Sequence, residues 1–390
     1  MASYVSSYAN RFYTAVESGF GQVAAVTAAN RISAVKLGIK QQLEVAERKD
    51  KTGSRTFAGY PPGGRRRTQW DLRTYMTSWT NTAQPPASGP LFQGCLGGQP
   101  ALFSGATAGA GSSGTTLVFA APHGLAPGRA VAVGGEIRFV AAAPNATTVQ
   151  LNAPFSAAPA AGTAIGATCS YSPATELKSV SIFDYWSPAT AVQRLIAGAA
   201  VNRLELRVNG DFHEFQFSGE AQDLIDSSSF AEGMGQLTAF PAEPELGAFD
   251  YSIVPGHMGQ AWLGTSPEQF FTITNAVFAV DNGLELRAKE FGSNVPKGIS
   301  PGRRVVTVDF DLYEIDDDST KALYQAARQQ SPISVMFQLG EQQGQLAGVY
   351  LKSVLAEVPE FDDSDNRLQW RFRSARAQGT VDDEIVVAFA

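Results

Sequence analysis

Apolar and polar residues alternate along many stretches of the chain, which predicts β-strands with one buried and one solvated face. Between 305 and 315, for example, Val306, Val308 and Phe310 alternate with polar residues that include Asp309 and Asp311. Strands predicted in this way, or from β-rich runs, cover 34–49, 68–75, 201–208, 212–217, 270–280, 283–290, 305–315, 333–339, 346–354, 367–373 and 384–389.

Two segments carry a helical pattern instead. The acidic run at 316–319 supplies an N-cap and a negative first turn. Leu323, Ala326 and Ala327 then recur at helical spacing, which predicts a helix that ends near Gln330. In the first half, 77–84 predicts about one helical turn before two prolines end it. The pattern as a whole predicts a mostly-β protein made of β-sandwiches, each with a short flanking α-helix.

The chain also contains an internal repeat, a signal that is best interpreted before any single motif. Short matches recur at residue-number differences of 238 to 245, and the difference then falls to 174 and 164. The fall predicts that a block is inserted in the first copy between Phe92 and Leu177. The matches are Gly21-Gln22 with Gly259-Gln260, Leu43-Glu44 with Leu284-Glu285, Asp71-Leu72 with Asp311-Leu312, Phe92-Gln93 with Phe337-Gln338, 177–180 with 351–354, and 202–204 with 366–368.

Together these signals predict three folded units, which a length of 390 residues allows. The predicted organisation is an N-terminal arm at 1–30, a first domain from 31–95 and 173–225, an inserted module at 96–172, a connection at 226–255 and a second domain at 256–390. The insert is dominated by Ala, Gly, Thr and Pro. Its β-rich runs at 116–119, 130–133, 137–140 and 147–151 predict a small all-β module rather than a linker.

Composition limits the function classes. A hydrophobic content of 44% and a charged content of 17% are typical of a globular chain. The net charge of −7 argues against a protein that grips nucleic acid over a basic face. Neither a signal peptide nor a membrane span is predicted, so no membrane partner is expected. Cys95 and Cys169 lie near the two ends of the insert, where both free thiols and a disulfide remain open.

Motifs for catalysis or cofactor binding are weak. The three histidines lie far apart and without other ligands at metal-binding spacing: His123, His213 and His257. Residues 33–36, 51–53 and 364–366 spell three motifs of penicillin-recognising serine hydrolases, but the order is wrong and the first runs into a strand.

Asp309 and Asp311 could in principle act as an acid and a base, yet similar strand acids elsewhere favour a solvated surface. The chain is therefore predicted not to be an enzyme and to hold no cofactor or metal. The basic loop at 49–67 has few aromatic residues for stacking on bases, so contact with an acidic patch on a neighbouring subunit is the preferred interpretation.

Four features together resemble the tail tube, or major tail, proteins of bacteriophages with long non-contractile tails. They are the stretch 11–22; the loops ending in Pro-Gly-Gly-Arg-Arg at 62–66 and Pro-Gly-Arg-Arg at 301–304, each before an Asp-Leu strand; the strand, acidic-capped helix and strand of 303–339; and the C-terminal pattern of Gly379, an acidic run at 382–384 and an apolar strand. The resemblance covers about 20–95 and 173–390. The insert resembles the decoration modules of some members.

The resemblance implies a structural subunit whose stacked rings surround a channel for genomic DNA, in a virion tail assembled in the host cytoplasm. Members with one copy form six-membered rings, so the duplicated chain implies three chains per ring, with six chains as the alternative. Double-stranded DNA would pass without specific binding, and other tail proteins would bind at the tube ends. Closure into a barrel would also remove the open edges of the sheets.

The resemblance also gives roles to charged residues. Acids opposite the apolar strand faces are predicted to line the channel and to keep DNA centred by repulsion: Glu44, Glu205, Glu285, Asp309 and Asp311. Basic loop residues are predicted, together with the arm 1–30, to contact the next ring: Arg55, Arg65, Arg66, Arg67, Lys297, Arg303 and Arg304.

Other classes remain as alternatives. One is a distal tail or baseplate ring protein that shares the fold. Another is a capsid or other self-assembling β protein of the virion. An enzyme or a carbohydrate-binding protein is a third, although the insert has few aromatic residues with which to bind a glycan. Electron microscopy would distinguish them as long tubes, closed rings or monomers.

Overall fold

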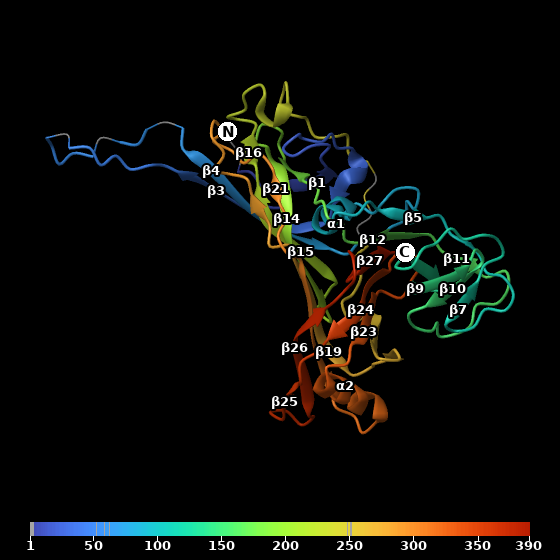
Figure 1. Cartoon of the computed structure of the whole chain (residues 1–390). Helices are drawn as coiled ribbons and strands as arrows, with labels where there is room; N and C mark the ends of the chain where they lie inside the picture. The colour runs from blue at the N-terminus through green and yellow to red at the C-terminus, as the bar shows by residue number, and fades with distance from the viewer. Residues whose placement is uncertain (1–3, 52, 58, 62, 248, 250–251) are drawn as a thin grey trace.

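The computed structural model describes residues 4–51, 53–57, 59–61, 63–247, 249 and 252–390. Within these residues the chain is mostly β with two α-helices, which confirms the predicted class. In Figure 1, long strands form a central wall from top to bottom, a hairpin projects from it to the left, and a small β module lies on the right.

The central wall is an antiparallel ribbon of eight strands to which both halves of the chain contribute. Its order is β3 (Ala34–Glu44), β4 (Arg65–Tyr75), β15 (Glu214–Ala221), β14 (Arg194–Val208), β19 (Ile273–Asp281), β22 (Val305–Tyr313), β26 (Gln369–Ala377) and β25 (Glu360–Asp362). The first four strands come from the first copy and the last four from the second. The copies join where 203–208 of β14 pair with 276–281 of β19.

Each copy adds an outer sheet behind its part of the ribbon. In the first copy the order is β2 (Arg31–Ile32), β1 (Asn10–Val16), β13 (Val180–Trp186), β14 and β16 (Asp223–Asp226). In the second copy it is β18 (Glu268–Gln269), β17 (Gly259–Gly264), β23 (Ile333–Leu339), β24 (Ala347–Leu355) and β27 (Val386–Phe389). β14 and β24 each cross from the outer sheet to the ribbon, so the same pairing order occurs twice.

The ribbon has one apolar face, and this face forms the main core. Alternate residues such as Leu72, Phe217, Leu206, Phe278 and Phe310 are buried in a single cluster. Helix α1 (Gly89–Leu96) packs in the same cluster. The apolar side of α2 (Asp318–Gln329) also belongs to it and covers the far end of the second copy. The burial of every second strand residue explains why the sequence alternates.

The helix in the first copy does not lie at 77–84, so that prediction is wrong. The helix is α1, which starts after Pro85-Pro86 and has a proline in its first turn, where the missing N–H costs nothing. Six apolar or small residues of α1 are buried, so its helical period is hidden. The matched Phe92 and Phe337 consequently lie in a helix and in β23, and this part of the repeat is not structurally equivalent. Asp71 and Asp311 do lie in the corresponding strands β4 and β22.

Part of the predicted N-terminal arm is a strand. β1 pairs along its whole length with β13, and Tyr13 is fully buried between the outer sheet and the connection at 226–255. The sequence signal was weak because this strand is short and its neighbours are rich in small residues. The other predicted domain boundaries stay predictions.

The inserted module contains the four strands expected from its β-rich runs. They are β7 (Thr116–Val118), β8 (Ala130–Val133), β9 (Glu136–Asn145) and β10 (Thr148–Leu151), and they form one sheet. The short pair β6 (Ala106–Thr107) and β11 (Ala164–Ile165) closes the module around its own apolar core. At its base, β5 (Ala101–Phe103) and β12 (Thr168–Tyr171) extend the outer sheet of the second copy beyond β27. Cys95 and Cys169 are both buried and free.

Candidate functional site

The polar face of the ribbon is one surface on which the candidate residues gather. It lies opposite the buried core, and on β4, β14, β15, β19 and β22 its side chains come from alternate positions. Cross-strand neighbours on this face have opposite charges in several places. Arg67 donates to Glu220 at 2.6 Å, and Arg73 lies 3.6 Å from Glu214. The face therefore carries both signs of charge in paired form.

Three of the five predicted channel acids lie on this face. Glu205 accepts hydrogen bonds from Arg207 at 2.6 Å and from Arg203 at 3.4 Å. Asp309 accepts a hydrogen bond from the Ser374 backbone N–H at 2.6 Å. Asp311 is only 7% exposed.

Asp311 forms an ion pair with Arg373, which arrives from β26, 62 residues away in sequence. The hydrogen bond to Asp311 raises the pKa of Arg373 above its ordinary value, so the guanidinium remains charged. Because Glu205 and Asp311 are neutralised by arginines, they add little net negative potential to the face.

The other two acids, Glu44 and Glu285, lie at one end of the ribbon. They line a cleft of about 370 Å³ between the copies, which we call the junction cleft. Its walls are Arg65, Arg66, Arg67, Thr68, Glu220 and Ala221 from the first copy, and Leu284, Glu285, Leu286, Ala288, Lys289 and Pro296 from the second.

The predicted ring-contact residues divide into two groups. Three of them form ion pairs within the same chain: Arg66 with Asp223, Arg67 with Glu220, and Arg304 with Asp382 and Glu384. Burial lowers the pKa of Arg304, but hydrogen bonds from it to Glu384 and Asp382 raise that pKa further, so the net shift is upward. Arg55, Lys297 and Arg303 are exposed, and Arg65 is half-buried.

A second cleft, of about 500 Å³, lies at the equivalent place in the second copy. We call it the open cleft, and its walls are Arg303, Arg304, Val306, Leu355, Arg376, Ala377, Gln378, Gly379, Thr380, Asp382 and Glu384. Neither Arg303 nor Arg376 forms an ion pair with any residue that the structure describes. The open cleft therefore has two cationic groups without acidic partners.

The ribbon ends in two strands whose outer edges are unpaired within the described chain. β3 pairs only with β4, and β25 pairs only with β26. Such edges expose backbone N–H and C=O groups to other chains. Phe361 on β25 is 58% exposed and stacks on Trp370 at 5.4 Å, so apolar surface is also available at this end.

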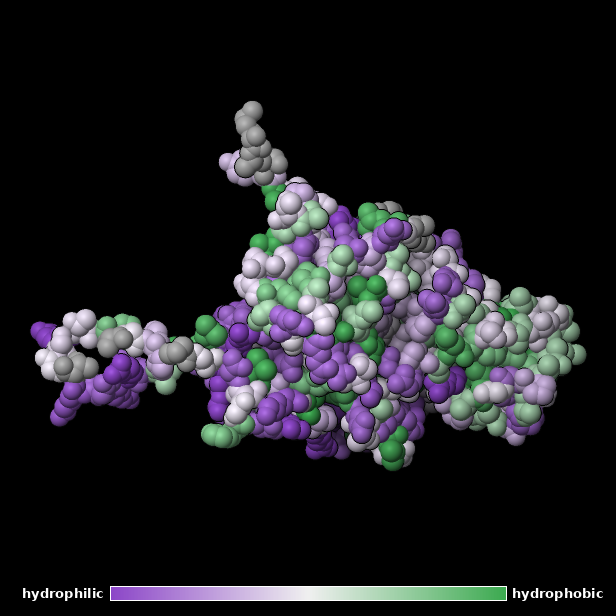
Figure 2. Space-filling view, turned by 90° about the horizontal axis from the view of Figure 1, so that it is seen from above, coloured by the Kyte–Doolittle hydropathy of each residue, from purple (hydrophilic) through white to green (hydrophobic). Residues whose placement is uncertain are grey.

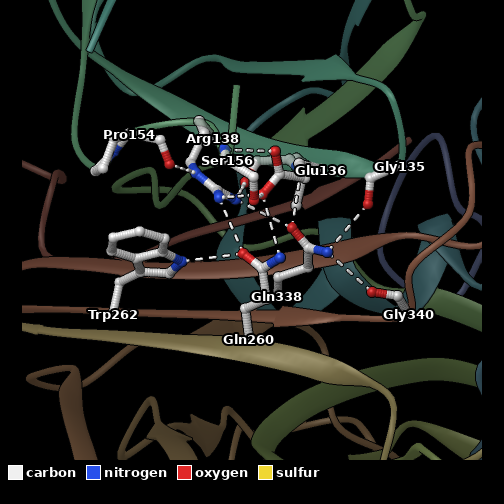
Figure 3. A network of polar contacts seen from close by, with 10 residues as sticks. Gly135, Glu136, Arg138, Pro154, Ser156, Gln260, Trp262, Gln338 and Gly340 are labelled. Atoms are coloured by element: carbon white, nitrogen blue, oxygen red, sulfur yellow. Dashed lines mark hydrogen bonds and ion pairs between the residues drawn. The ribbon is translucent and has the colours of Figure 1, made fainter. Parts of the chain in front are cut away.

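A buried polar network, which the sequence interpretation missed, fixes the module to the second copy (Figure 3). Arg138 on β9 is fully buried and donates to Glu136 at 2.7 Å, to Gln260 at 2.9 Å and to Gln338 at 3.1 Å. Its guanidinium also lies 5.0 Å from the Trp262 ring centre, within range for a cation–π contact. In Figure 3, residues of the module and residues of the second copy converge on this guanidinium.

Within the network, burial lowers the pKa of Arg138. Burial opposes ionisation of Glu136, yet the hydrogen bonds from Ser156 and the charge of Arg138 lower the pKa of that carboxyl overall. Both groups are therefore charged and paired. The signal that could have revealed the network is that Arg129, Glu136 and Arg138 are the only Lys, Arg, Asp or Glu residues between 97 and 172.

The exposed surface of the module is consequently almost free of charge. Figure 2 shows it at the right as mostly white and pale green, whereas the body carries many hydrophilic residues. Among the described residues, no helix is long and apolar enough to cross a membrane, and no group of three acidic, histidine or cysteine side chains could hold a metal ion.

Comparison with protein families places this geometry in context. A family model described as "Phage tail tube protein" matches residues 86–390. The match covers most of the chain, including the inserted module and the complete second copy. A comparison with curated proteins gave no match.

Proposed function

We propose a mode of assembly for this chain, which belongs to the phage tail tube protein family and is a structural subunit of the virion tail. Copies of the chain would pair edge to edge into a closed ring, and rings would stack on one another. The channel inside would conduct double-stranded DNA. Self-assembly follows from the family, whereas the symmetry and the channel are the parts proposed here.

The observation that supports the ring most directly is the order of the ribbon. Each of its seven pairings is antiparallel, so strand direction alternates and β3 and β25, at its two ends, run in opposite directions. A second copy placed with its β3 beside β25 would continue the alternation without a break. Closure would then pair every ribbon strand on both sides, which removes the exposed edges.

The number of strands favours three chains per ring. Three chains of eight ribbon strands give a barrel of 24 strands, with a diameter of roughly 48 Å for a strand spacing of about 4.8 Å and a tilt of about 40°. Side chains on the inner face would leave roughly 38 Å, which accommodates a DNA duplex. Six chains would double the barrel diameter to roughly 95 Å, far wider than the duplex requires. We therefore favour the trimer over the hexamer.

In such a ring the polar face of the ribbon would form the channel wall. Glu205, Asp309 and Asp311 would belong to this wall, and Glu44 and Glu285 would lie near its rim. Because arginines pair with Glu205 and Asp311, we propose that the wall is passive through charge neutralisation more than through repulsion. DNA would meet no continuous basic surface to bind.

Ring stacking would use the surfaces at the two rims. The hairpin that joins β3 to β4 projects from the body, so it can reach a neighbouring ring (Figure 1). Arg55 lies midway along its sequence, between the end of β3 and the start of β4. Exposed Lys297 is a second candidate for this contact. Other tail proteins would bind the last ring by the same rims. Assembly in the host cytoplasm agrees with two buried free thiols.

Electron microscopy of the purified chain tests the proposal. Long hollow tubes with three chains per ring are the expected result, and six chains per ring would refute the trimer. Closed rings that never stack would instead favour a distal tail ring protein. A chain lacking 52–64 should stay folded by circular dichroism but should form no tubes, and normal tubes from this variant would overturn the role of the hairpin.

A further inference from the structure

The two copies carry equivalent hairpins in different surroundings. The first hairpin (45–64) follows the last paired positions Glu44 and Arg65, and the second hairpin (282–304) follows Asp281 and Val305. They are nearly equal in length. In Figure 1 the first hairpin projects into solvent, whereas the second, which contains β21 (Ile299–Ser300), lies against the first copy.

The second hairpin is held by the first copy at its root and along its length. The Leu284 N–H donates to the Asn202 side chain at 2.9 Å, and the Arg66 N–H donates to the carbonyl of Asn294 at 2.8 Å. The Gln222 side chain donates to the carbonyl of Pro296 at 3.1 Å. As a result Leu284 is only 9% exposed.

The surfaces beneath these hairpins are also equivalent. Arg65-Arg66 begins β4 in the junction cleft, and Arg303-Arg304 precedes β22 in the open cleft. Glu220 pairs with Gln69 on the first surface, and Arg376 pairs with Thr307 at the same place on the second. The junction cleft is lined on one side by the second hairpin, from Leu284 to Pro296. Among the residues that line the open cleft, only Arg303 and Arg304, at the end of the second hairpin, belong to a hairpin.

The groups exposed on the first hairpin and in the open cleft are complementary. Leu43, which the repeat matches with Leu284, is 62% exposed, and Val45, two residues later, is 39% exposed. In the open cleft, Leu355 is 37% exposed. The first hairpin root also carries two exposed acids: Glu47, which forms no ion pair with a described residue, and Asp50, which is paired with Arg48 at 2.7 Å. Arg303 and Arg376 lack acidic partners among the described residues.

We propose that the root of the first hairpin, with the end of β3 (residues 43–50), docks in the open cleft of the neighbouring chain in the same ring. This inference rests on the proposed function and adds the contact surface to it. The partner is a second copy of the chain, and the junction between the two copies is the template. Val45 packs beside the neighbour's Leu355, and the acids of the hairpin root face the neighbour's Arg303 and Arg376. Only the more distant part of the hairpin remains to reach the next ring.

Cysteine cross-linking tests this contact in the full-length protein. The variant V45C/L355C, assembled into tubes and oxidised mildly, should give disulfide-linked oligomers on a non-reducing gel. The largest species should be a trimer if three chains close the ring. V45C and L355C alone are the matched controls, and neither should give species larger than a dimer, because each chain then has one new thiol. Cys95 and Cys169 are buried and do not need to be replaced.

The outcomes separate this inference from the proposed function. Tubes without cross-linked oligomers would overturn the docking contact and leave the tube assignment standing. An absence of tubes from the wild-type chain would instead refute the function itself. A cross-linked ladder that extends beyond a hexamer would place the contact between rings and would also overturn the inference.

Charge reversal gives a second measurement. R376E should raise the protein concentration needed for tubes about tenfold, because the new carboxylate would face Glu47 and Asp50. Adding E47K and D50K to R376E should return that concentration to within about threefold of the wild type, since the pairing is restored with opposite signs. E232K, at an exposed position in the connection, is the control. Failure of the combined variant to recover, while circular dichroism shows it folded, would contradict the contact.

Discussion

Arg138 should decide whether the inserted module is fixed to the body or moves on it. The change R138A removes five hydrogen bonds, to Pro154, Ile137, Gln338, Glu136 and Gln260. It leaves the carboxylate of Glu136 without its cationic partner in a largely buried place. Removing one member of a buried ion pair costs about 3–5 kcal/mol. The module has its own apolar core, so the loss should appear as local opening at the interface and not as global unfolding.

Hydrogen exchange measured by mass spectrometry is the appropriate assay, because a chain with several folded units does not unfold in one two-state step. A loss of 3–5 kcal/mol corresponds to an open population raised roughly 140- to 3,700-fold, at about 1.4 kcal/mol per tenfold. Amide exchange in peptides that cover 135–140 and 333–340 should be faster by roughly this factor. Peptides from the core of the module, such as 147–151, should keep their protection.

The matched control is R129A, which removes a half-buried arginine of the same module that forms no ion pair with a described residue. It should change exchange at the interface less than about threefold, as expected for a surface substitution. The variant E136Q/R138M should recover much of the protection, because an apolar replacement of a buried pair is often neutral. Equal protection in R138A and R129A would refute the reasoning and would show that apolar packing alone holds the module.

Two further predictions concern buried ionisable groups. Burial raises the pKa of Cys95 to about 12 and of Cys169 to about 11, so a thiol reagent at pH 8 should label neither cysteine until the chain is unfolded; rapid labelling of the native chain would contradict the buried placement. Burial opposes ionisation of Glu243, but hydrogen bonds from Arg11 and Tyr13 lower the pKa of Glu243 overall. Because the pKa of Glu243 is lower in the folded than in the unfolded chain, its ionised carboxylate stabilises the fold at pH values above the unfolded pKa. This stabilisation is lost as the pH falls through the folded pKa. Acid should therefore loosen the connection at 226–255 from β1 in a proteolysis assay, and E243Q should remove this pH dependence.

Local features of the fold were predictable because they depend on neighbours in sequence. The alternation at 305–315 predicts a strand because every second side chain enters the core, and β22 occupies Val305–Tyr313. The acidic run before α2 predicts a capped helix, and Asp317 accepts a hydrogen bond from the Thr320 N–H at 2.8 Å. By contrast, α1 is buried all round, so no helical face was visible in the sequence.

The partners of charged residues were not predictable, because they come from distant parts of the chain. Asp311 was expected to present a free negative charge, but β26 brings Arg373 beside it through a pairing that no local pattern encodes. The contact between Arg138 and Gln338 similarly joins residues 200 positions apart. Alternation shows which face of a strand is solvated, but the charge of that face depends on the order of the strands.

The order of the strands also gives a reason for the duplication. In a ring of single-copy subunits, each junction must form between separate chains. Here the junction between β14 and β19 forms when the chain folds, because the connection tethers the copies at an effective concentration on the order of millimolar. In a ring of three chains, only every second junction would depend on encounters between chains. The copies are then free to differ: the first can carry the module and an exposed hairpin, while the second hairpin is used inside the chain to secure the junction. The geometry of that internal junction is therefore the best available template for the contacts between chains.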